Sequence, residues 1–290
     1  MRRVLVGVLA VVSTLLVGCG GSTPSATSPS PGAPAAKGSL ILATTTSTQD
    51  SGLLDDLLPA FTRDTGWKVK TLAVGGGQAL ELGRRGEADV LLVHSPAAEE
   101  KFMAEGVAGP RRLVMHNDFV LVGPADDPAG IRGSASVDAM KKIATARAVF
   151  VSRGDDSGTN AKEDDLWGKA GVTPKGKWYQ STGQGMGATL RVASEKAGYT
   201  LSDRATYLAQ RDTLKLEILS EGDPGLLNVY HVIELTTKAG PRVQTDASRA
   251  FADWIVSPPA QEQIGRFGQA EFGQPLFTPD AGEDEAGLGT

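Results

Sequence analysis

Short apolar runs alternate with amphipathic stretches along residues 39–290. A short apolar run is typical of a buried strand, and apolar residues at every third or fourth position are typical of a helix packed on a sheet. The alternation predicts an α/β fold with largely parallel sheets. The expected strands are SLILA from residue 39, WKVKTLAV from 67, ADVLLVH from 88, FVLVGP from 119, RAVFVS from 147 and LKLEIL from 214.

One amphipathic helix is predicted between Asp50 and Gly66. The glycine at its end predicts a left-handed C-terminal cap, and Pro59 predicts a bend inside the helix. Its apolar positions recur at helical spacing and are Leu53, Leu54, Leu57, Leu58 and Phe61.

The first residues follow a different pattern. Arg2 and Arg3 precede an apolar run over 4–17, which is typical of a signal peptide spanning residues 1–18. The run is shorter than the roughly 20 residues that a membrane-spanning helix needs, so we expect it to be cleaved. Gly18-Cys19 resembles a bacterial lipobox, in which the cysteine becomes the lipid-modified N-terminus; the alternative is an incidental cysteine.

Residues 19–38 begin with that cysteine and continue without any large apolar side chain. Their Pro, Ser, Ala and Gly content predicts a flexible tether, because such a segment cannot bury enough surface to fold. At about 3.1 Å per residue in extended stretches, it would hold a folded domain several nanometres from a membrane. We therefore expect an extracytoplasmic protein, lipid-anchored at the outer face of the cell membrane or periplasmic.

Composition narrows the function classes. Apolar residues make up 40% and charged residues 22%, which excludes a globally disordered chain. The formal net charge is -5, and loss of Arg2 and Arg3 with the leader would make it -7, which excludes a basic nucleic-acid binder. Because Cys19 is the only cysteine, an intramolecular disulfide and a thiolate zinc site are excluded.

Two apolar strands that end in polar or proline-marked segments are predicted to cross between two lobes. With these crossings, lobe I comprises 39–122 plus 236–290 and lobe II comprises 123–235. The helical stretch around 251–255 completes lobe I, and the last residues, 280–290, are expected to fray. The crossing segments are FVLVGPADDP and NVYHVIELTT.

Consecutive hydroxyl residues occupy the end of the first strand and the start of the next helix. Hydroxyl donors beside the unpaired N–H groups and the positive dipole of a helix N-terminus predict an anion site. The alternative is ordinary N-capping, which uses one or two hydroxyls. The residues are Thr44, Thr45, Thr46, Ser47 and Thr48.

A second strand end carries Arg153, with Ser157 and Thr159 at the entrance of the following helix. The guanidinium offers five donors and stays charged, so we expect it to bind the same anion. The alternative is a solvated salt bridge to Asp155 or Asp156. Both strand ends share an Asp-Ser-Gly string, which indicates either equivalent places in two lobes or a chance repeat.

Glycine-rich loops add further candidates, because glycine lets backbone N–H groups approach a ligand closely. Gly76 and Gly77 precede one predicted helix, and Gly183 and Gln184 precede another. Ordinary turn glycines are the alternative for each loop.

Catalytic motifs of the common enzyme classes are missing from the sequence. His94, His116 and His231 are scattered singles, which more often have structural than catalytic or metal-binding roles. We therefore expect no enzyme, no cofactor and no metal centre. The remaining enzyme hypothesis is a secreted hydrolase with a nucleophile in the Thr44–Ser47 cluster, and the lack of a nearby histidine or lysine in the sequence counts against it.

Several ordered segments across residues 40–235 carry a resemblance. They are TTTSTQDSGLLDDLLPAF, VGGGQALELGRRGEADVLLVHSPAAEE, NDFVLVGPADDPAG, FVSRGDDSGTNAKE, WYQSTGQGMGATL, YTLSDRATYLA and EGDPGLLNVY. Together they closely resemble the tungstate-binding lipoproteins of bacterial ABC importers. The resemblance implies a type II periplasmic-binding-protein fold, with two α/β lobes and two crossing strands that close over one oxyanion.

The resemblance also implies the site. In that family the anion is contacted by the Thr-Thr-Thr-Ser motif and by the arginine and threonine of a Ser-Arg-Gly-Asp-x-Ser-Gly-Thr motif. The matching residues here are Thr44 to Ser47, Arg153 and Thr159. Asn160 departs from the pattern, since histidine usually follows the Ser-Gly-Thr. An asparagine still donates a hydrogen bond and caps a helix, so the departure bears on the ranking of oxyanions.

These residues suit an unprotonated dianion, because a tungstate or molybdate site needs donors and no inward carboxylate. Phosphate keeps a proton part of the time, and Asp155 is the carboxylate that would make a phosphate site. Sulfate would have to be rejected by cavity size. We expect a monomer that captures tungstate, or molybdate less readily, closes, and docks on an ABC permease. A signalling or adhesion lipoprotein of the same fold is a further alternative.

Overall fold

The computed structural model describes residues 34–288, and its main sheet has the strand order β10-β4-β9-β3-β1-β2. The strands β1 (Gly38–Thr45), β2 (Trp67–Val74) and β3 (Val90–Val93) pair in parallel. The other strands of this sheet, β4 (Ala108–Gly123), β9 (Leu227–Leu235) and β10 (Thr278–Pro279), pair antiparallel. The expectation of largely parallel sheets is therefore wrong, because the crossing strands run antiparallel to their neighbours.

Strand β4 joins two groups of elements. Its first part pairs with β9, whereas Phe119–Gly123 pairs with β7 (Thr200–Asp203) and β8 (Glu217–Ser220). A separate small sheet pairs β5 (Phe150–Ser152) with β6 (Tyr179–Ser181) in parallel. Each expected strand segment overlaps an observed strand, and the two predicted crossing segments overlap the end of β4 and most of β9. The lobe boundaries at 122 and 235 stay a prediction.

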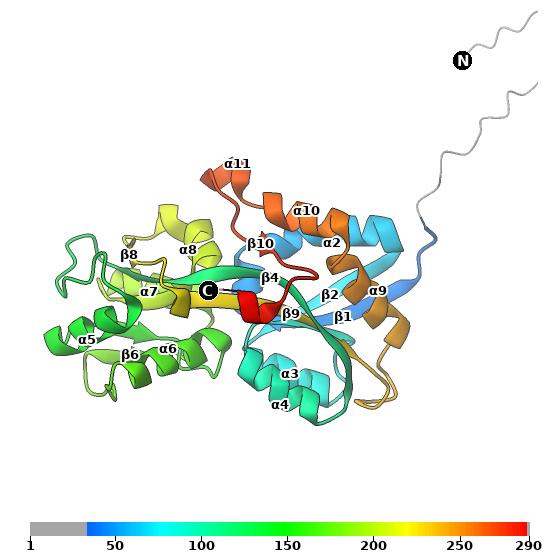
Figure 1. Cartoon of the computed structure of the whole chain (residues 1–290), viewed down its shortest axis with the longest axis horizontal. Coiled ribbons are helices and arrows are strands. Elements are labelled where there is room, and N and C mark those ends of the chain that lie inside the picture. Colours follow the sequence, from blue (N-terminus) through cyan, green and yellow to red (C-terminus); the bar gives the residue numbers. More distant parts are fainter. Residues whose placement is uncertain (1–33, 289–290) are drawn as a thin grey trace, which may run out of the picture. The chain divides into compact units, whose positions relative to one another are not determined.

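Helices gather on both sides of the β4–β9 pair, as Figure 1 shows. We call the side with β1–β3 the first half and the side with β5–β6 the second half. The first half carries α1 (Thr46–Asp50), α2 (Leu53–Thr65), α3 (Gly76–Arg84), α4 (Pro96–Ala104), α9 (Thr245–Ile255), α10 (Pro258–Arg266) and α11 (Gln269–Phe272). The second half carries α5 (Ser136–Ala146), α6 (Gly158–Lys169), α7 (Met186–Glu195) and α8 (Arg204–Gln210). Single 3-10 turns are η1 (Arg211–Thr213), η2 (Pro224–Leu226) and η3 (Glu285–Gly287).

Helix α2 confirms the predicted helix and its glycine end, and the bend at Pro59 stays a prediction. Gly66 adopts a φ of 79° and its N–H caps the Thr62 carbonyl at 2.9 Å. The apolar face packs on α9, where the Phe61 ring lies 5.2 Å from Phe251 and 5.5 Å from Trp254 in edge-on contacts. Burial of one such side chain stabilises the fold by roughly 1.5–3 kcal/mol. Packing against α2 therefore holds α9 in the first half, although α9 lies far along the chain.

The apolar core of the second half surrounds a buried carboxylate. The Phe150 and Trp167 rings lie 5.1 Å apart, and Glu163 beside them is 2% exposed. Its Oε1 accepts from Trp167 Nε1 at 3.0 Å and from Tyr179 Oη at 2.8 Å, and its Oε2 accepts from Ser152 Oγ at 2.7 Å. Burial raises the pKa of Glu163 to about 7, against the lowering effect of these hydrogen bonds.

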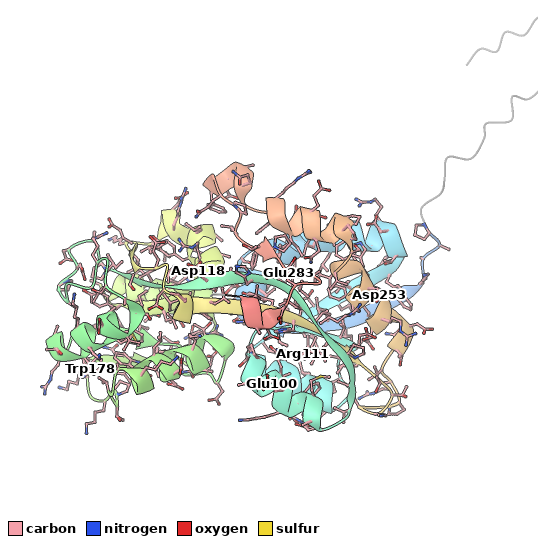
Figure 2. All side chains as sticks on the ribbon, in the orientation of Figure 1. Glu100, Arg111, Asp118, Trp178, Asp253 and Glu283 are labelled. Atoms are coloured by element: carbon pink, nitrogen blue, oxygen red, sulfur yellow. The ribbon has the colours of Figure 1, made fainter. Side chains whose placement is uncertain are left out.

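This carboxylate predicts a pH-dependent stability. Because the folded protein binds the proton of Glu163 more tightly than the unfolded chain, its contribution is full below about pH 4.5 and is lost by about pH 7. Replacement Glu163→Gln should therefore stabilise the protein by about 2 kcal/mol more at pH 8 than at pH 5. Denaturant unfolding at both pH values measures this difference. Glu100→Gln on the exposed side of α4 (Figure 2) is the control, and an equal effect of Glu163→Gln at both pH values would contradict the prediction.

The C-terminal segment is held along the crossing strands. His116 Nδ1 on β4 lies 2.7 Å from Asp280 Oδ2, and the Arg111 guanidinium donates to Glu285 Oε2 at 3.1 Å. Arg111, labelled in Figure 2, also donates to the buried Glu99 Oε2 at 2.9 Å. The expected fraying of residues 280–290 is therefore wrong for 280–288, because His116 and Arg111 on β4 bind side chains of this segment.

Of the predictions for the N-terminal segment, the described residues test only the end of the tether. Lys37 N–H donates to the Gly66 carbonyl at 3.0 Å and β1 begins at Gly38, so the end of the expected tether belongs to the sheet. The predicted signal peptide, Cys19 and residues 20–33 lie outside the described residues. Over residues 34–288, no helix is long and apolar enough to cross a membrane.

Candidate functional site

Helices α1, α3, α6 and α7 begin at one place between the two halves. A Cβ placed on Gly76, at the start of α3, would lie 3.5 Å from the backbone nitrogen of Gly158 at the start of α6. A Cβ on Gly185, which caps α7, would lie 2.9 Å from Thr46 Oγ1 at the start of α1. Helix N-termini present unpaired N–H groups and a positive dipole end, so this place favours an anion.

Arg153 is the buried cation of this place, and it is 1% exposed. Its Nη2 donates to Thr46 Oγ1 from the first half at 3.1 Å, and its Nη1 donates to Thr159 Oγ1 at 3.3 Å. Its buried Nε has no hydrogen-bond partner among residues 34–288. A buried charged donor without a partner is costly, so the arrangement suits a group that supplies an acceptor.

The carboxylate of Asp155 faces Arg153. Its Oδ2 accepts from Arg153 Nη2 at 2.6 Å, and its Oδ1 accepts from Ser157 N–H at 3.3 Å. Both oxygens are therefore engaged by donors of the second half. The geometry supports the interpretation of Asp155 as a partner of Arg153.

The hydroxyls of the first-half motif have distinct roles. Thr44 Oγ1 donates to the Leu92 carbonyl at 2.7 Å, so the Thr44 hydroxyl ties β1 to β3, and the role of Thr44 at the anion stays a prediction. Thr45 caps α1 by accepting from Thr48 N–H at 3.2 Å, and its Oγ1 lies 3.0 Å from Ser47 Oγ and 2.7 Å from Thr48 Oγ1. Thr46 is the hydroxyl of this motif that contacts Arg153.

The entrance of α6 is built by capping. Ser157 Oγ accepts from Asn160 N–H at 3.2 Å, and Asn160 Oδ1 accepts from Asp156 N–H at 3.1 Å. Asn160 therefore closes the loop before the helix, as a capping residue does. The side chains of Ser157 and Asn160 order the loop that precedes α6, and Ser157 stays a proposed ligand through its place at the helix start.

The two glycine-rich loops differ in their position relative to the site. Gly76 is buried against α6, and a Cβ on Gly77 would lie 3.4 Å from the Asp156 carbonyl, so the start of α3 lies at the site. Gly183 and Gln184 are exposed, and their N–H groups donate to the Arg153 carbonyl at 2.8 Å and to Thr182 Oγ1 at 3.2 Å. These two donors close a turn within the second half, and the proposed contacts of Gly183 and Gln184 to the anion stay a prediction.

The two Asp-Ser-Gly strings occupy different places. Asp50 ends α1 and Ser51 and Gly52 lead into α2, whereas Asp156 and Ser157 lead into α6. Both strings therefore lead into a helix, but only the first follows another helix, and their equivalence stays a prediction. Asp50 contacts the second half, since its Oδ2 accepts from Gly187 N–H at 3.1 Å.

His94 was not predicted as part of the site. It follows β3, and its Nε2 lies 3.0 Å from Thr45 Oγ1 and 3.2 Å from Ser47 Oγ, so the expectation that no histidine lies near the hydroxyls is wrong. Burial lowers its pKa to about 4, and the charge of Arg153 also lowers it. The signal in the sequence was its place: parallel strands β1 and β3 end at the same edge of the sheet.

A second buried carboxylate lies near Arg153. Asp203 caps α8 by accepting from Thr206 N–H at 2.9 Å, and burial raises the pKa of Asp203 to about 6. The Thr206 hydroxyl donates to the Ser47 carbonyl at 3.1 Å. This cap therefore holds a buried contact between the two halves.

Within residues 34–288, no group of three or more His, Cys, Asp or Glu side chains is arranged to hold a metal ion.

Comparison with known proteins decides the family. The model of the PBP superfamily domain matches residues 22–259. A tungstate-binding protein TupA of Peptoclostridium acidaminophilum is 52% identical over 85% of this chain and 87% of the relative. The chain belongs to the TupA branch of the PBP superfamily. A TupA of Campylobacter jejuni is 39% identical over 81% of this chain and 88% of the relative.

Solved structures agree with this family assignment. The tungstate-binding TupA of Desulfovibrio alaskensis has a TM-score of 0.70 and 46% identity, covering 84% of this chain and 100% of that chain. A structure titled as the tungstate ABC transporter of Geobacter sulfurreducens has a TM-score of 0.74 and 46% identity, covering 79% and 98%. The predicted α/β fold of the type II periplasmic binding proteins is confirmed.

Proposed function

We propose that this protein captures tungstate outside the cytoplasm and delivers it to the permease of an ABC importer. The observation that carries the proposal is Arg153, a buried cation that bonds hydroxyls of both halves and keeps its Nε unpaired. The proteins of the same family that are named for tungstate support this choice of anion. Molybdate, which has the same charge and shape, is expected to bind less tightly.

The donor set favours an oxyanion without a proton. Arg153, Thr46, Thr159 and the helix N-termini offer N–H and O–H donors, and charge-assisted hydrogen bonds contribute about 1.5–3 kcal/mol each. Asp155, the carboxylate that a phosphate site would use, already accepts from Arg153 and Ser157. Phosphate therefore lacks this acceptor, and sulfate is to be rejected by cavity size.

Contacts between the halves support a closing mechanism. Thr46 to Arg153, Ser47 to Thr206 and Asp50 to Gly187 all join α1 to the second half. The halves are linked through β4 and β9, so we propose that these strands act as the hinge and that closure completes the donor set. The closed monomer then docks on the permease, where opening releases the anion. No bond of the ligand is made or broken.

Calorimetric titration of the purified, anion-free protein with tungstate, molybdate, sulfate and phosphate tests the proposal. We expect one tight site for tungstate and weak binding of sulfate and phosphate. Tight phosphate binding with no response to tungstate would contradict the proposed ligand. No response to any of the four anions would favour a signalling or adhesion lipoprotein of the same fold.

Lipid anchoring at Cys19 is a further prediction. The full chain is expected in the washed membrane fraction, and Cys19→Ser is expected in the soluble fraction, because a lipid-modified cysteine would be the sole membrane attachment after removal of residues 1–18. Fractionation and immunoblotting measure the distribution. Retention of Cys19→Ser on washed membranes would contradict the anchor.

A further inference from the structure

A buried polar chain connects the hydroxyl cluster to the crossing strands. His94 is 4% exposed, with Nε2 toward Thr45 and Ser47 and Nδ1 2.8 Å from Asn228 Oδ1. Asn228 lies on β9 and is 1% exposed. The Tyr230 ring of the same strand stacks on the His94 ring at 4.7 Å, so the imidazole is fixed from its face and from both nitrogens.

The partners of Asn228 decide where the imidazole proton lies. Asn228 Nδ2 donates to Asn117 Oδ1 at 2.7 Å and to Tyr230 Oη at 3.0 Å, so its Oδ1 faces His94. In this amide orientation the oxygen of Asn228 only accepts, and His94 Nδ1 then carries the proton. Burial keeps the ring neutral at physiological pH, which leaves a lone pair on Nε2.

We propose that His94 is a positioning residue, which Asn228 holds in the neutral Nδ1–H form so that Nε2 accepts the hydroxyl proton of Thr45 or Ser47. One proton of the cluster is then committed to His94. Since Thr45 Oγ1 already accepts from Thr48 N–H, fewer arrangements of the hydroxyl protons remain before the anion arrives. The effect of His94 on anion binding rests on the proposed function. The position of the proton on His94 does not, because it depends only on contacts within the protein.

These contacts support the positioning role of His94 better than they support a hydrolase. Ser47, His94 and Asn228 follow the order nucleophile, base and orienting group of an acyl-transfer enzyme. However, Ser47 is fully buried and the Thr206 hydroxyl donates to its carbonyl, so the second half covers this segment. A base with a strongly lowered pKa is also poorly matched to proton transfer near neutral pH.

Nitrogen-15 NMR of the histidine rings tests the proton position directly. The His94 signals, assigned by their loss in His94→Gln, should show a protonated Nδ1 and an unprotonated Nε2 from pH 5.5 to 8, with and without tungstate. A protonated Nε2, or titration within this range, would overturn the proposal. This readout does not require that tungstate bind.

Binding by paired variants tests the consequence. His94→Leu removes the acceptor and should weaken tungstate binding about 100-fold, whereas His94→Gln, whose amide oxygen can replace Nε2, should stay within about tenfold. Tyr230→Phe removes one hydroxyl from the same polar chain but leaves Asn228 bonded to Asn117, and should stay within about threefold. Equal losses in His94→Leu and His94→Gln would overturn the positioning role.

A further variant and a chemical probe cover the remaining outcomes. If His94→Leu does not fold by circular dichroism, Asn228→Ala takes its place: it keeps His94, should show both ring tautomers, and should bind tungstate about tenfold more weakly. An unchanged single tautomer in Asn228→Ala would overturn the proposal. Covalent labelling of Ser47 by a fluorophosphonate would also overturn it, because Ser47 would then be a reactive nucleophile.

Discussion

Replacement of Arg153 by methionine is expected to weaken tungstate binding by about 1,000-fold or more. The variant loses the buried charge and the donors that bond Thr46 and Thr159 across the halves. Loss of two charge-assisted hydrogen bonds from the guanidinium to the anion, at about 2 kcal/mol each, would correspond to this factor. Calorimetric titration, or competition with a weaker anion, measures the change.

Two further variants separate the causes of that loss. Arg153→Met leaves Asp155 without its cation, so the combination with Asp155→Asn removes the unpaired charge as well. We expect the double variant to stay at least 100-fold weaker than the original protein. Arg112→Met, which breaks ion pairs with Glu234 and Asp253 outside the site, is the control. Recovery of tight binding in the double variant would show that Arg153 only neutralises Asp155.

Gly185→Ala is expected to weaken tungstate binding roughly 100-fold by holding the halves apart. The new Cβ would lie 2.9 Å from Oγ1, 3.0 Å from Cβ and 3.2 Å from Cγ2 of Thr46, so either Thr46 or the second half must move. The φ of Gly185 is -64°, which alanine adopts without strain, and the effect should therefore come from the contact alone.

Small-angle scattering and titration together test whether the added Cβ holds the two halves apart. With saturating tungstate, Gly185→Ala should keep a larger radius of gyration than the original protein. Gly168→Ala is the matched control, because it lies in α6 with open space around the added Cβ. A tungstate-loaded Gly185→Ala protein as compact and as tightly bound as the original would show that Thr46 and Gly185 do not limit closure.

Local patterns predicted the elements well because each depends on residues close in the chain. The alternation of apolar residues located β1, β2, β3, β5 and the end of β4, and the glycine after Thr65 located the end of α2. The hydroxyl motif and Arg153 were found because both follow apolar strands and precede helices. Such features combine a strand end and a helix start, which a linear sequence displays directly.

The missed features depend on neighbours far apart in the chain. Thr44 looked like its neighbours in sequence, but the carbonyl of Leu92 on β3 takes its proton. His94 joins the site only because β1 and β3 pair in parallel. The antiparallel direction of β9 and the bonds of Asp280 and Glu285 likewise require the assembled sheet.

The apolar clusters have a consequence for the order of folding. The cluster of the second half runs from Phe119 to Leu226 in one continuous segment, whereas the main cluster joins Leu40 to Phe277. Contacts between distant parts of a chain form more slowly than local ones, because the closure of long loops costs entropy. A chain that emerges N-terminus first can therefore assemble the 119–226 core early, and its first half stays incomplete until the C-terminal helices and strand arrive.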